Sequence, residues 1–140
     1  MTGTKNCQFT GCSFTLAETE LQACVAYQDC EIEFNSCTFD FLNQKANEYM
    51  ILKPTKLVMQ NCTVDTYRYA IVFSTHTEKT QVLLLGNTFS CGHYVMMAAS
   101  SIGEYDITIA NNVRYSPVYT VGFFGNWSNT EITVKDINNH

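Results

Sequence analysis

The sequence predicts an all-β fold, a parallel β-helix in which short strands stack on one another from coil to coil. Three observations predict this class. A segment recurs every 25 residues, apolar and polar residues alternate within each copy, and no stretch shows the periodicity of an α-helix. A fixed period of this length is typical of solenoids, and a strand-like motif at that period indicates a β-helix. We expect one domain, residues 1–140, with about five to six coils.

The first strand of each repeat carries two apolar columns. The earlier column reads Ile32, Leu57, Val82, Ile107 and Ile132. The column two residues later reads Phe34, Met59, Leu84, Ile109 and Val134. Side chains two residues apart point to the same face of a strand, so both columns are expected to line the interior.

A bend and a second short strand follow the first strand. The bend position is held by residue types that suit a turn, namely Ser36, Asn61, Gly86 and Asn111. The next position reads Cys12, Cys37, Cys62, Asn87 and Asn112, and two residues later an inward column reads Phe14, Phe39, Val64 and Phe89. A stacked Asn can satisfy backbone groups that the bend leaves unpaired. Because Asn shares its column with Cys, and the seven cysteines are odd in number, we expect free thiols.

A further strand is expected on the remaining side of each coil. The clearest segments are Tyr67–Ser74, Tyr94–Ser100 and Val118–Gly125, with Ala23–Tyr27 and Glu48–Lys53 less regular. Both alternating sets of side chains are apolar there, which is typical of a strand buried on both faces. Apolar residues that face outward predict a protein interface, with copies of the chain or with flanking β-helix coils. The residues assigned to it are Val58, Leu83, Leu85, Val72, Val95, Met97 and Phe124.

Composition narrows the function classes. Hydrophobic residues make up 46% of the chain and charged residues 15%, which fits a folded protein. The net charge of −5 argues against a nucleic-acid partner that is bound by neutralising phosphates. No apolar run is long enough to cross a bilayer, and the first residues lack an apolar signal segment. We therefore expect no membrane span, and either a chain made without a secretory signal or a fragment of a longer one.

The repeat resembles the coils of one known superfamily. The runs "KLVMQNCTV" and "EIEFNSCTF" are similar to those of the single-stranded, right-handed parallel β-helix of the pectin-lyase-like superfamily. The similarity extends from about Lys5 to Asn139 and concerns the fold more than the activity. Such proteins include polysaccharide lyases and hydrolases, phage tailspikes, adhesins and surface-layer proteins.

The leading hypothesis is a non-catalytic structural or adhesive module. It would belong to a multimeric surface or virion assembly, such as a tailspike-like fibre, with a glycan as a further candidate partner. Its compartment is not given by the sequence, and a surface-exposed or virion-associated place follows only from this hypothesis. No cofactor is expected. No Cys-x-x-Cys pair occurs, so no metal site is expected either.

The alternative is a lyase or hydrolase that acts on an acidic polysaccharide. Asp40 and Asp65 share a column, so the two carboxylates should lie one coil apart and could act as an acid/base pair or hold Ca²⁺. The catalytic set would be Asp40, Asp65, Arg68, His93 and Arg114, with Tyr67 and Tyr115 against the ligand. The Asp-Asp and Arg-x-Lys motifs of the related hydrolases are missing, and only "CGHY" is similar to their Gly-His-Gly motif. Solvated turn residues without any catalytic role would give the same sequence pattern.

Overall fold

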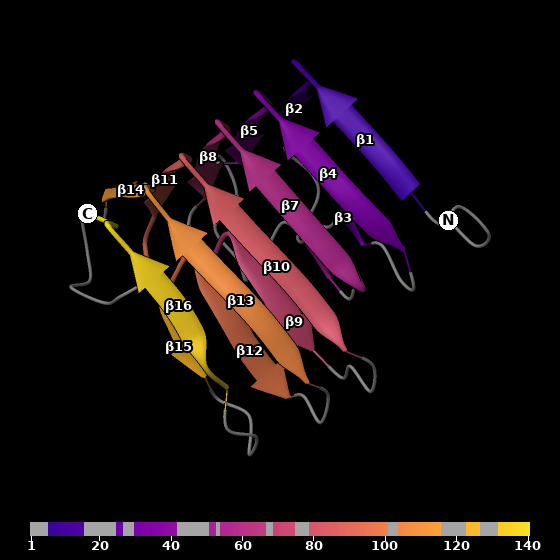
Figure 1. The fold of residues 1–140 in the computed structure, drawn as a ribbon. Coiled ribbons are helices and arrows are strands. Elements are labelled where there is room, and N and C mark those ends of the chain that lie inside the picture. Colours follow the sequence, from indigo (N-terminus) through magenta and orange to yellow (C-terminus); the bar gives the residue numbers. More distant parts are fainter. Residues whose placement is uncertain are drawn as a thin grey trace.

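The computed structural model describes residues 6–15, 25–26, 30–41, 51–52, 54–66, 69–74, 79–100, 104–115, 123–126 and 132–140. Every regular element in these ranges is a β-strand, and all paired strands run parallel (Figure 1). The predicted all-β parallel solenoid is therefore confirmed. No helix in the described part of the chain has the length and apolarity to cross a bilayer.

The largest sheet has six strands, each from a successive coil. In spatial order they are β1 (Asn6–Thr10), β4 (Glu31–Asn35), β7 (Lys56–Gln60), β10 (Thr80–Leu85), β13 (Tyr105–Ala110) and β16 (Val134–Ile137). Neighbours from β1 to β13 pair in register at a spacing of 25 residues, as Ile32 with Leu57 and Val82 with Ile107. The repeat period therefore sets the register directly.

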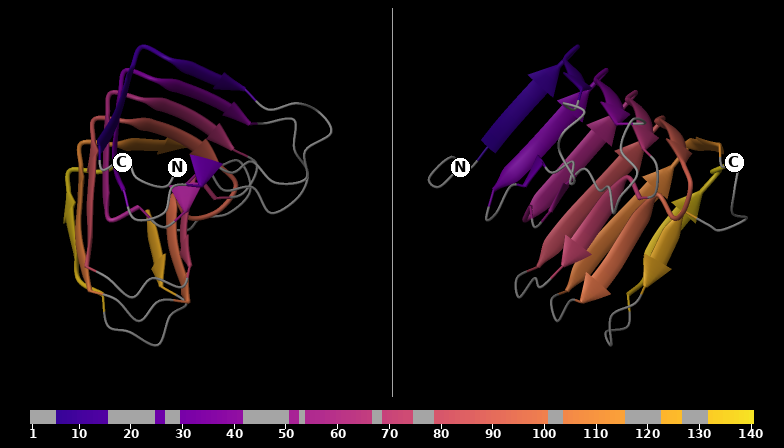
Figure 2. Two further views of the ribbon diagram at one scale, coloured as in Figure 1. Left: turned by 90° about the vertical axis from the view of Figure 1, so that its right-hand side faces the viewer. Right: turned by 180° about the vertical axis from the view of Figure 1, so that it is seen from behind.

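Further sheets form the other sides of the coils (Figure 2). The five-stranded sheet contains β2 (Ser13–Thr15), β5 (Thr38–Phe41), β8 (Thr63–Thr66), β11 (Thr88–Cys91) and β14 (Val113–Tyr115). The three-stranded sheet contains β9 (Ile71–Ser74), β12 (Met96–Ser100) and β15 (Phe124–Asn126), and β3 (Val25–Ala26) pairs with β6 (Ile51–Leu52). Three turns thus carry a described strand in all three larger sheets, fewer than the five to six coils expected.

The core is built from the inward columns. The side chains of Phe34, Phe39, Leu57, Val82 and Leu84 are fully buried in it. Aromatic rings stack from coil to coil at its N-terminal end, where Phe14 lies 4.8 Å from Phe39 and Phe9 lies 5.3 Å from Phe34, measured between ring centroids. Equivalent apolar side chains of successive coils lie on top of one another. Each coil therefore buries the apolar side chains of the next, and this burial stabilises the stack.

The last coil departs from the predicted period. Its spacing is 27 residues, because Ile107 pairs with Val134 and Ile109 pairs with Asp136. The expected column positions of Ile132 and Val134 are therefore wrong by two residues. The two extra residues place a charged side chain, Asp136, at the end of an otherwise apolar column.

The bends have the predicted backbone conformation. Gly11, Ser36, Asn61, Gly86, Asn111 and Asn138 all have φ between 50° and 64°. Most residues with a side chain adopt this left-handed region only at a cost in free energy. Gly has no such cost, and Asn has a smaller one than most other residues. Gly86 has a second constraint, since a Cβ there would lie 3.0 Å from Asn61 Oδ1.

Inside the bends, side chains of the Cys/Asn column hydrogen-bond the backbone of neighbouring coils. Asn87 Oδ1 accepts the Cys62 backbone N–H at 2.9 Å, and Asn87 Nδ2 donates to the Met59 carbonyl at 2.9 Å. Asn112 repeats the pattern toward Asn87 and Leu84, both at 2.9 Å. The predicted role of the stacked Asn is confirmed, and Asn139 extends the ladder into the last coil.

The described cysteines are free thiols, as predicted. Burial raises the pKa of the Cys62 thiol above its ordinary value of 9.0. Burial also raises the pKa of Cys91, although the Arg114 guanidinium nearby opposes the shift. Both thiols therefore stay protonated in the folded protein at pH values where the unfolded chain begins to ionise.

This shift predicts an alkaline loss of stability. The folded state holds these protons more tightly than the unfolded chain, so the contribution is intact below about pH 9 and is lost as the pH rises through the raised folded pKa. Urea midpoints measured from pH 7 to 10.5 should fall above about pH 9. Cys62→Ala should shrink that fall, and an identical alkaline slope in the variant would contradict the prediction.

Candidate functional site

The two carboxylates of the enzyme hypothesis lie together on the outward face of the five-stranded sheet. Asp40 and Asp65 are directly paired between β5 and β8, which confirms that they are one coil apart. Their column runs through Thr15, Asp40, Asp65, Ser90 and Tyr115. Tyr115 is 60% exposed at its end. A second outward column beside it reads Ser13, Thr38, Thr63, Thr88 and Val113. We call these two columns the polar face.

Arg114 is not part of the polar face. It pairs with Phe89, whose side chain is fully buried, so it occupies the inward column of the five-stranded sheet. Its Nη2 donates to the His93 carbonyl at 3.1 Å, and its charge acts on the Cys91 thiol. Adjacent residues of a strand point to opposite faces, so Arg114 is directed away from the side on which Asp65 lies.

His93 packs among aromatic rings. Its ring centroid lies 4.9 Å from that of Tyr69 and 5.0 Å from that of Tyr94, and the side chain is half-buried. Cys91 Sγ donates to the His93 carbonyl at 3.2 Å. These contacts pack the His93 ring between two tyrosines and anchor its backbone at the corner after β11.

The predicted catalytic set is therefore only partly assembled. Asp40 and Asp65 lie on the polar face, while Arg114 lies in the inward column. Arg68 and Tyr67 lie outside the described residues. In the ranges that the structure describes, no group of three or more His, Cys, Asp or Glu side chains is arranged to hold a metal ion.

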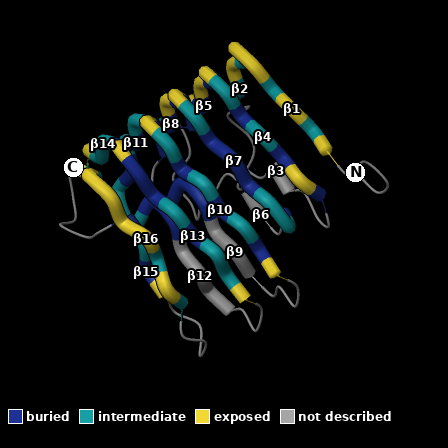
Figure 3. Tube along the Cα trace, in the orientation of Figure 1, coloured by how far each residue is buried: buried dark blue, intermediate teal, exposed yellow. Residues whose placement is uncertain are grey.

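A second surface lies on the outward face of the six-stranded sheet. It consists of the apolar residues Val58, Leu83, Leu85, Ala110 and Ile137, which we call the apolar strip. Val58 pairs with Leu83, and Leu85, Ala110 and Ile137 are consecutive across β10, β13 and β16. Their exposure is uneven: Val58 on β7 and Ala110 on β13 are each 8% exposed, the two leucines on β10 are half-buried, and Ile137 on β16, the outermost strand (Figure 3), is 48% exposed.

The structure corrects part of the predicted interface. Val95 is fully buried in the core, and Phe124 is half-buried against it, so neither belongs to an outward apolar surface. The side chains of Val72 and Met97 lie outside the described residues. The sequence reasoning missed Ala110 and Ile137. The signal that could have found Ile137 is the pair Asn138-Asn139, which repeats Asn111-Asn112 at a spacing of 27 residues.

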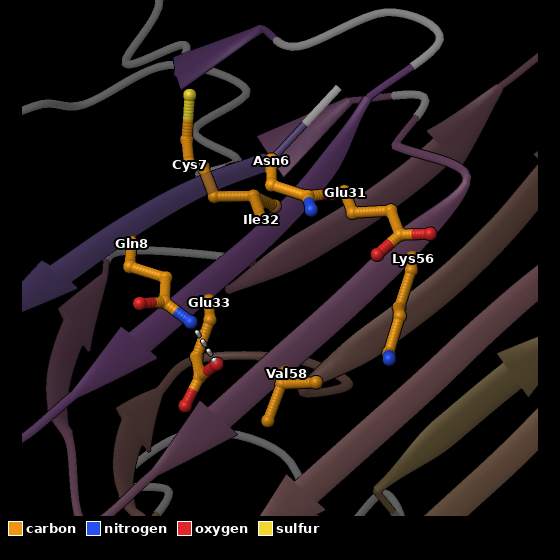
Figure 4. Close-up of a pocket in the computed structure, with 8 residues that line it drawn as sticks. All are labelled: Asn6, Cys7, Gln8, Glu31, Ile32, Glu33, Lys56 and Val58. Atoms are coloured by element: carbon orange, nitrogen blue, oxygen red, sulfur yellow. Dashed lines mark hydrogen bonds between the residues drawn. The ribbon is translucent and has the colours of Figure 1, made fainter. Parts of the chain in front are cut away.

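Polar residues lie next to the apolar strip at the end formed by Val58. A shallow hollow of about 140 Å³ lies over β1, β4 and β7, with Val58 in its wall (Figure 4). Its other lining residues are Asn6, Cys7, Gln8, Glu31, Ile32, Glu33 and Lys56. Gln8 Nε2 donates to Glu33 Oε2 at 3.1 Å across two strands. The outward face of the six-stranded sheet is thus polar near β1, and toward β16 the apolar strip lies beside the polar residues Thr108 and Lys135.

Comparisons with protein-family models, with curated proteins and with solved structures found no match to this chain. The class that the structure itself defines is the parallel β-solenoid, given by the stacked strand register. The resemblance to the pectin-lyase-like superfamily stays a prediction.

Proposed function

We propose that this chain is a non-catalytic structural module of a multimeric assembly, and that it associates with copies of itself through the apolar strip. The observation that supports this most directly is the continuity of the strip across four neighbouring strands, β7, β10, β13 and β16. In a solenoid with one solvated face per sheet, polar residues would be expected at these outward positions. Contiguous apolar residues on such a face usually mark a binding surface.

The surroundings of the strip fit an interface. Glu33 and Lys56 lie at its edge on one side, and Lys135 is exposed on β16 at the other. An apolar centre with a charged rim is the usual anatomy of a protein–protein contact. The strip lies on paired strands, so its backbone needs little ordering on binding.

The finer assignment extends the same proposal. A pectin-lyase-like β-helix in a surface or virion assembly, comparable to a tailspike fibre component, would use the coils as a rigid shaft. The polar face would then supply the sugar contacts of an adhesive module. Tyr115 carries an exposed ring in the same column as Asp65, and aromatic rings beside polar groups suit carbohydrate recognition.

Leu83→Glu combined with Leu85→Glu should dissociate the assembly. Two carboxylates placed in an apolar contact would lose their hydration, so we expect the self-association constant to weaken by about a hundredfold or more. Analytical ultracentrifugation across a concentration series measures the change. The matched control is Thr38→Glu with Thr63→Glu, which adds the same charge at exposed positions of the polar face. A monomeric wild-type protein, or equal effects of both pairs, would contradict the proposal.

For the lyase or hydrolase alternative we expect no cleavage, because Arg114 is directed away from the two carboxylates. Arg114 is therefore not in position to stabilise negative charge that develops in a substrate bound at the two carboxylates. Wild-type protein incubated with uronate-containing polysaccharides, with and without Ca²⁺, should release neither reducing ends nor unsaturated products. Cleavage by the wild type that is abolished in Asp65→Asn would establish the enzyme instead.

A further inference from the structure

The charged residues around the apolar strip follow an ordered pattern on the outward face of the six-stranded sheet. In the strands from β4 to β16, the outward charged side chains are Glu31 and Glu33 on β4, Lys56 on β7, Asp106 on β13 and Lys135 on β16. The middle one of these five strands, β10, carries no charge. Lys79 and Glu104 precede β10 and β13 and are not strand residues.

The strand register gives these charges matching positions on the two sides of β10. Lys56 and Asp106 both pair with Gln81, so they lie at the same height on the strands that flank β10. The next outward column reads Glu33, Val58, Leu83, Thr108 and Lys135. Glu33 and Lys135 are therefore also at one height, two strands from β10 on either side. In both cases the charge on one side of β10 is opposite in sign to its counterpart on the other side.

We infer that two copies of the chain pack with these faces together, related by a two-fold axis that runs parallel to the strands and lies over β10. The inference rests on the proposed association through the apolar strip and defines its geometry. A half-turn about this axis keeps each position along the strand direction and reverses the order of the strands. Strand β7 of one copy then faces β13 of the other, and β4 faces β16.

This arrangement places opposite charges against one another. Lys56 of each copy faces Asp106 of the other copy, and Glu33 of each copy faces Lys135 of the other. Two sheets that pack face to face lie about 10 Å apart, a gap that long charged side chains can bridge from both sides. The leucines of β10 lie on the axis and meet their own counterparts, so the contact has an apolar centre with paired charges around it. Such a self-complementary contact closes at two copies.

Other placements of the axis bring like charges together. Over β7 the axis would set Lys56 against its own counterpart, and over β13 it would do the same for Asp106. Midway between β7 and β10 it would set Glu31 against Asp106. An axis along the stack, over the middle column, would set Glu33 on Glu33 and Lys135 on Lys135. Because like charges across an interface oppose association, the pattern favours the axis over β10.

Mixing two charge-reversed variants tests the inference. In Lys56→Glu protein the new carboxylate would face Asp106, and in Asp106→Lys protein the new ammonium group would face Lys56. Each variant should therefore associate with itself about tenfold more weakly than the wild type. In a mixed dimer of the two variants every such contact again joins opposite charges, so its affinity should return to within about threefold of the wild type. Sedimentation equilibrium and native mass spectrometry with one variant isotope-labelled measure the affinities and the share of mixed dimers.

The matched control is a mixture of Lys56→Glu with Lys135→Glu. It changes the charge by the same kind of substitution but creates no new opposite pair, so mixing should bring no gain. Glu33→Lys mixed with Lys135→Glu should repeat the recovery at the second pair of positions. If the wild type forms dimers through the strip but Lys56→Glu and Asp106→Lys show no preference for each other, the axis over β10 is wrong and the proposed function stands. A monomeric wild-type protein would overturn both.

Cross-linking of the wild-type chain gives a test without substitutions. A zero-length carbodiimide reagent joins an amine to a carboxylate that it touches. Applied to mixed isotope-labelled and unlabelled protein, it should link Lys56 of one copy to Asp106 of another, and Lys135 to Glu33. Links between copies that join Lys56 to other carboxylates and never to Asp106 would overturn the inference.

Discussion

Replacing Phe39 by alanine is expected to lower the free energy of unfolding by about 3–5 kcal/mol. The ring is fully buried and stacks on Phe14, with centroids 4.8 Å apart and planes 7° from parallel. It also meets Phe34 edge-on at 5.0 Å and Phe41 at 6.1 Å. Alanine removes the ring from all three contacts and leaves a cavity, because neighbouring coils are fixed by their strand register.

The size of this loss matters because small domains are stable by only about 5–15 kcal/mol. Urea unfolding followed by circular dichroism measures it. Phe39→Leu keeps most of the volume and should lose less than about 1.5 kcal/mol. Asp40→Ala, on the exposed side of the same strand, should change stability by less than about 0.5 kcal/mol. If Phe39→Ala lost no more than Asp40→Ala, the inward column could not be the core.

The register of the fold could be predicted from the sequence because the repeat and the alternation agree. When Leu57 and Val82 share a column and face inward, the pairing of β7 with β10 has only one solution. The bends could be predicted for a related reason. Few residue types accept a left-handed backbone, so Asn61 and Gly86 mark the position from their identity alone.

Two features could not be predicted from the repeat and the alternation. They are the register of the last coil and the choice of inward side chains in the third strand of each coil. A fixed period cannot anticipate two extra residues, and the pairing of Ile109 with Asp136 follows only from the structure. In the third strand both alternating sets are apolar, so alternation does not say which one is inside. Val95 was therefore placed on the surface, although it is buried in the core.

The sequence prediction misplaced Arg114 in the candidate site, although the 25-residue spacing alone could have shown where it lies. Arg114 follows Phe89 by one period, so it belongs to the inward column and not beside Asp65. Proximity along the chain favoured it as a catalytic residue, but the direction of the side chain decides what it can contact. Asp40 and Asp65 were placed correctly because they share a column with each other.

The second large effect is expected for Asn87→Ala. Asn87 is 1% exposed, and its side chain pairs with the Cys62 N–H, the Met59 carbonyl and Asn112 Oδ1, each at 2.9 Å. Alanine would remove the side-chain acceptor of the buried Cys62 N–H and one hydrogen bond to the Met59 carbonyl, and a buried group left unpaired costs about 1–3 kcal/mol. We expect a total loss of about 3 kcal/mol in the free energy of unfolding, measured by urea denaturation.

Two further substitutions separate hydrogen bonding from the loss of volume. Asn87→Cys installs the residue found one coil earlier, where Cys62 Sγ accepts the Cys37 N–H at 3.4 Å and donates to the Gln60 carbonyl at 3.3 Å. It should therefore retain more stability than alanine does. A similar loss for both variants would show that the ladder contributes through packing alone.

Asn87→Asp keeps the shape but removes the donors. The introduced carboxylate would face the Met59 carbonyl and Asn112 Oδ1, two acceptors, in a buried site. Burial and these acceptors should raise its pKa in the folded state, so the protein should be most stable at low pH, where the group is protonated. Stability relative to the wild type should then fall as the pH rises above about 4 and through the raised folded pKa. A pH-independent difference would mean that water reaches the ladder. In that case the Asn column would not be a buried hydrogen-bond ladder between the coils.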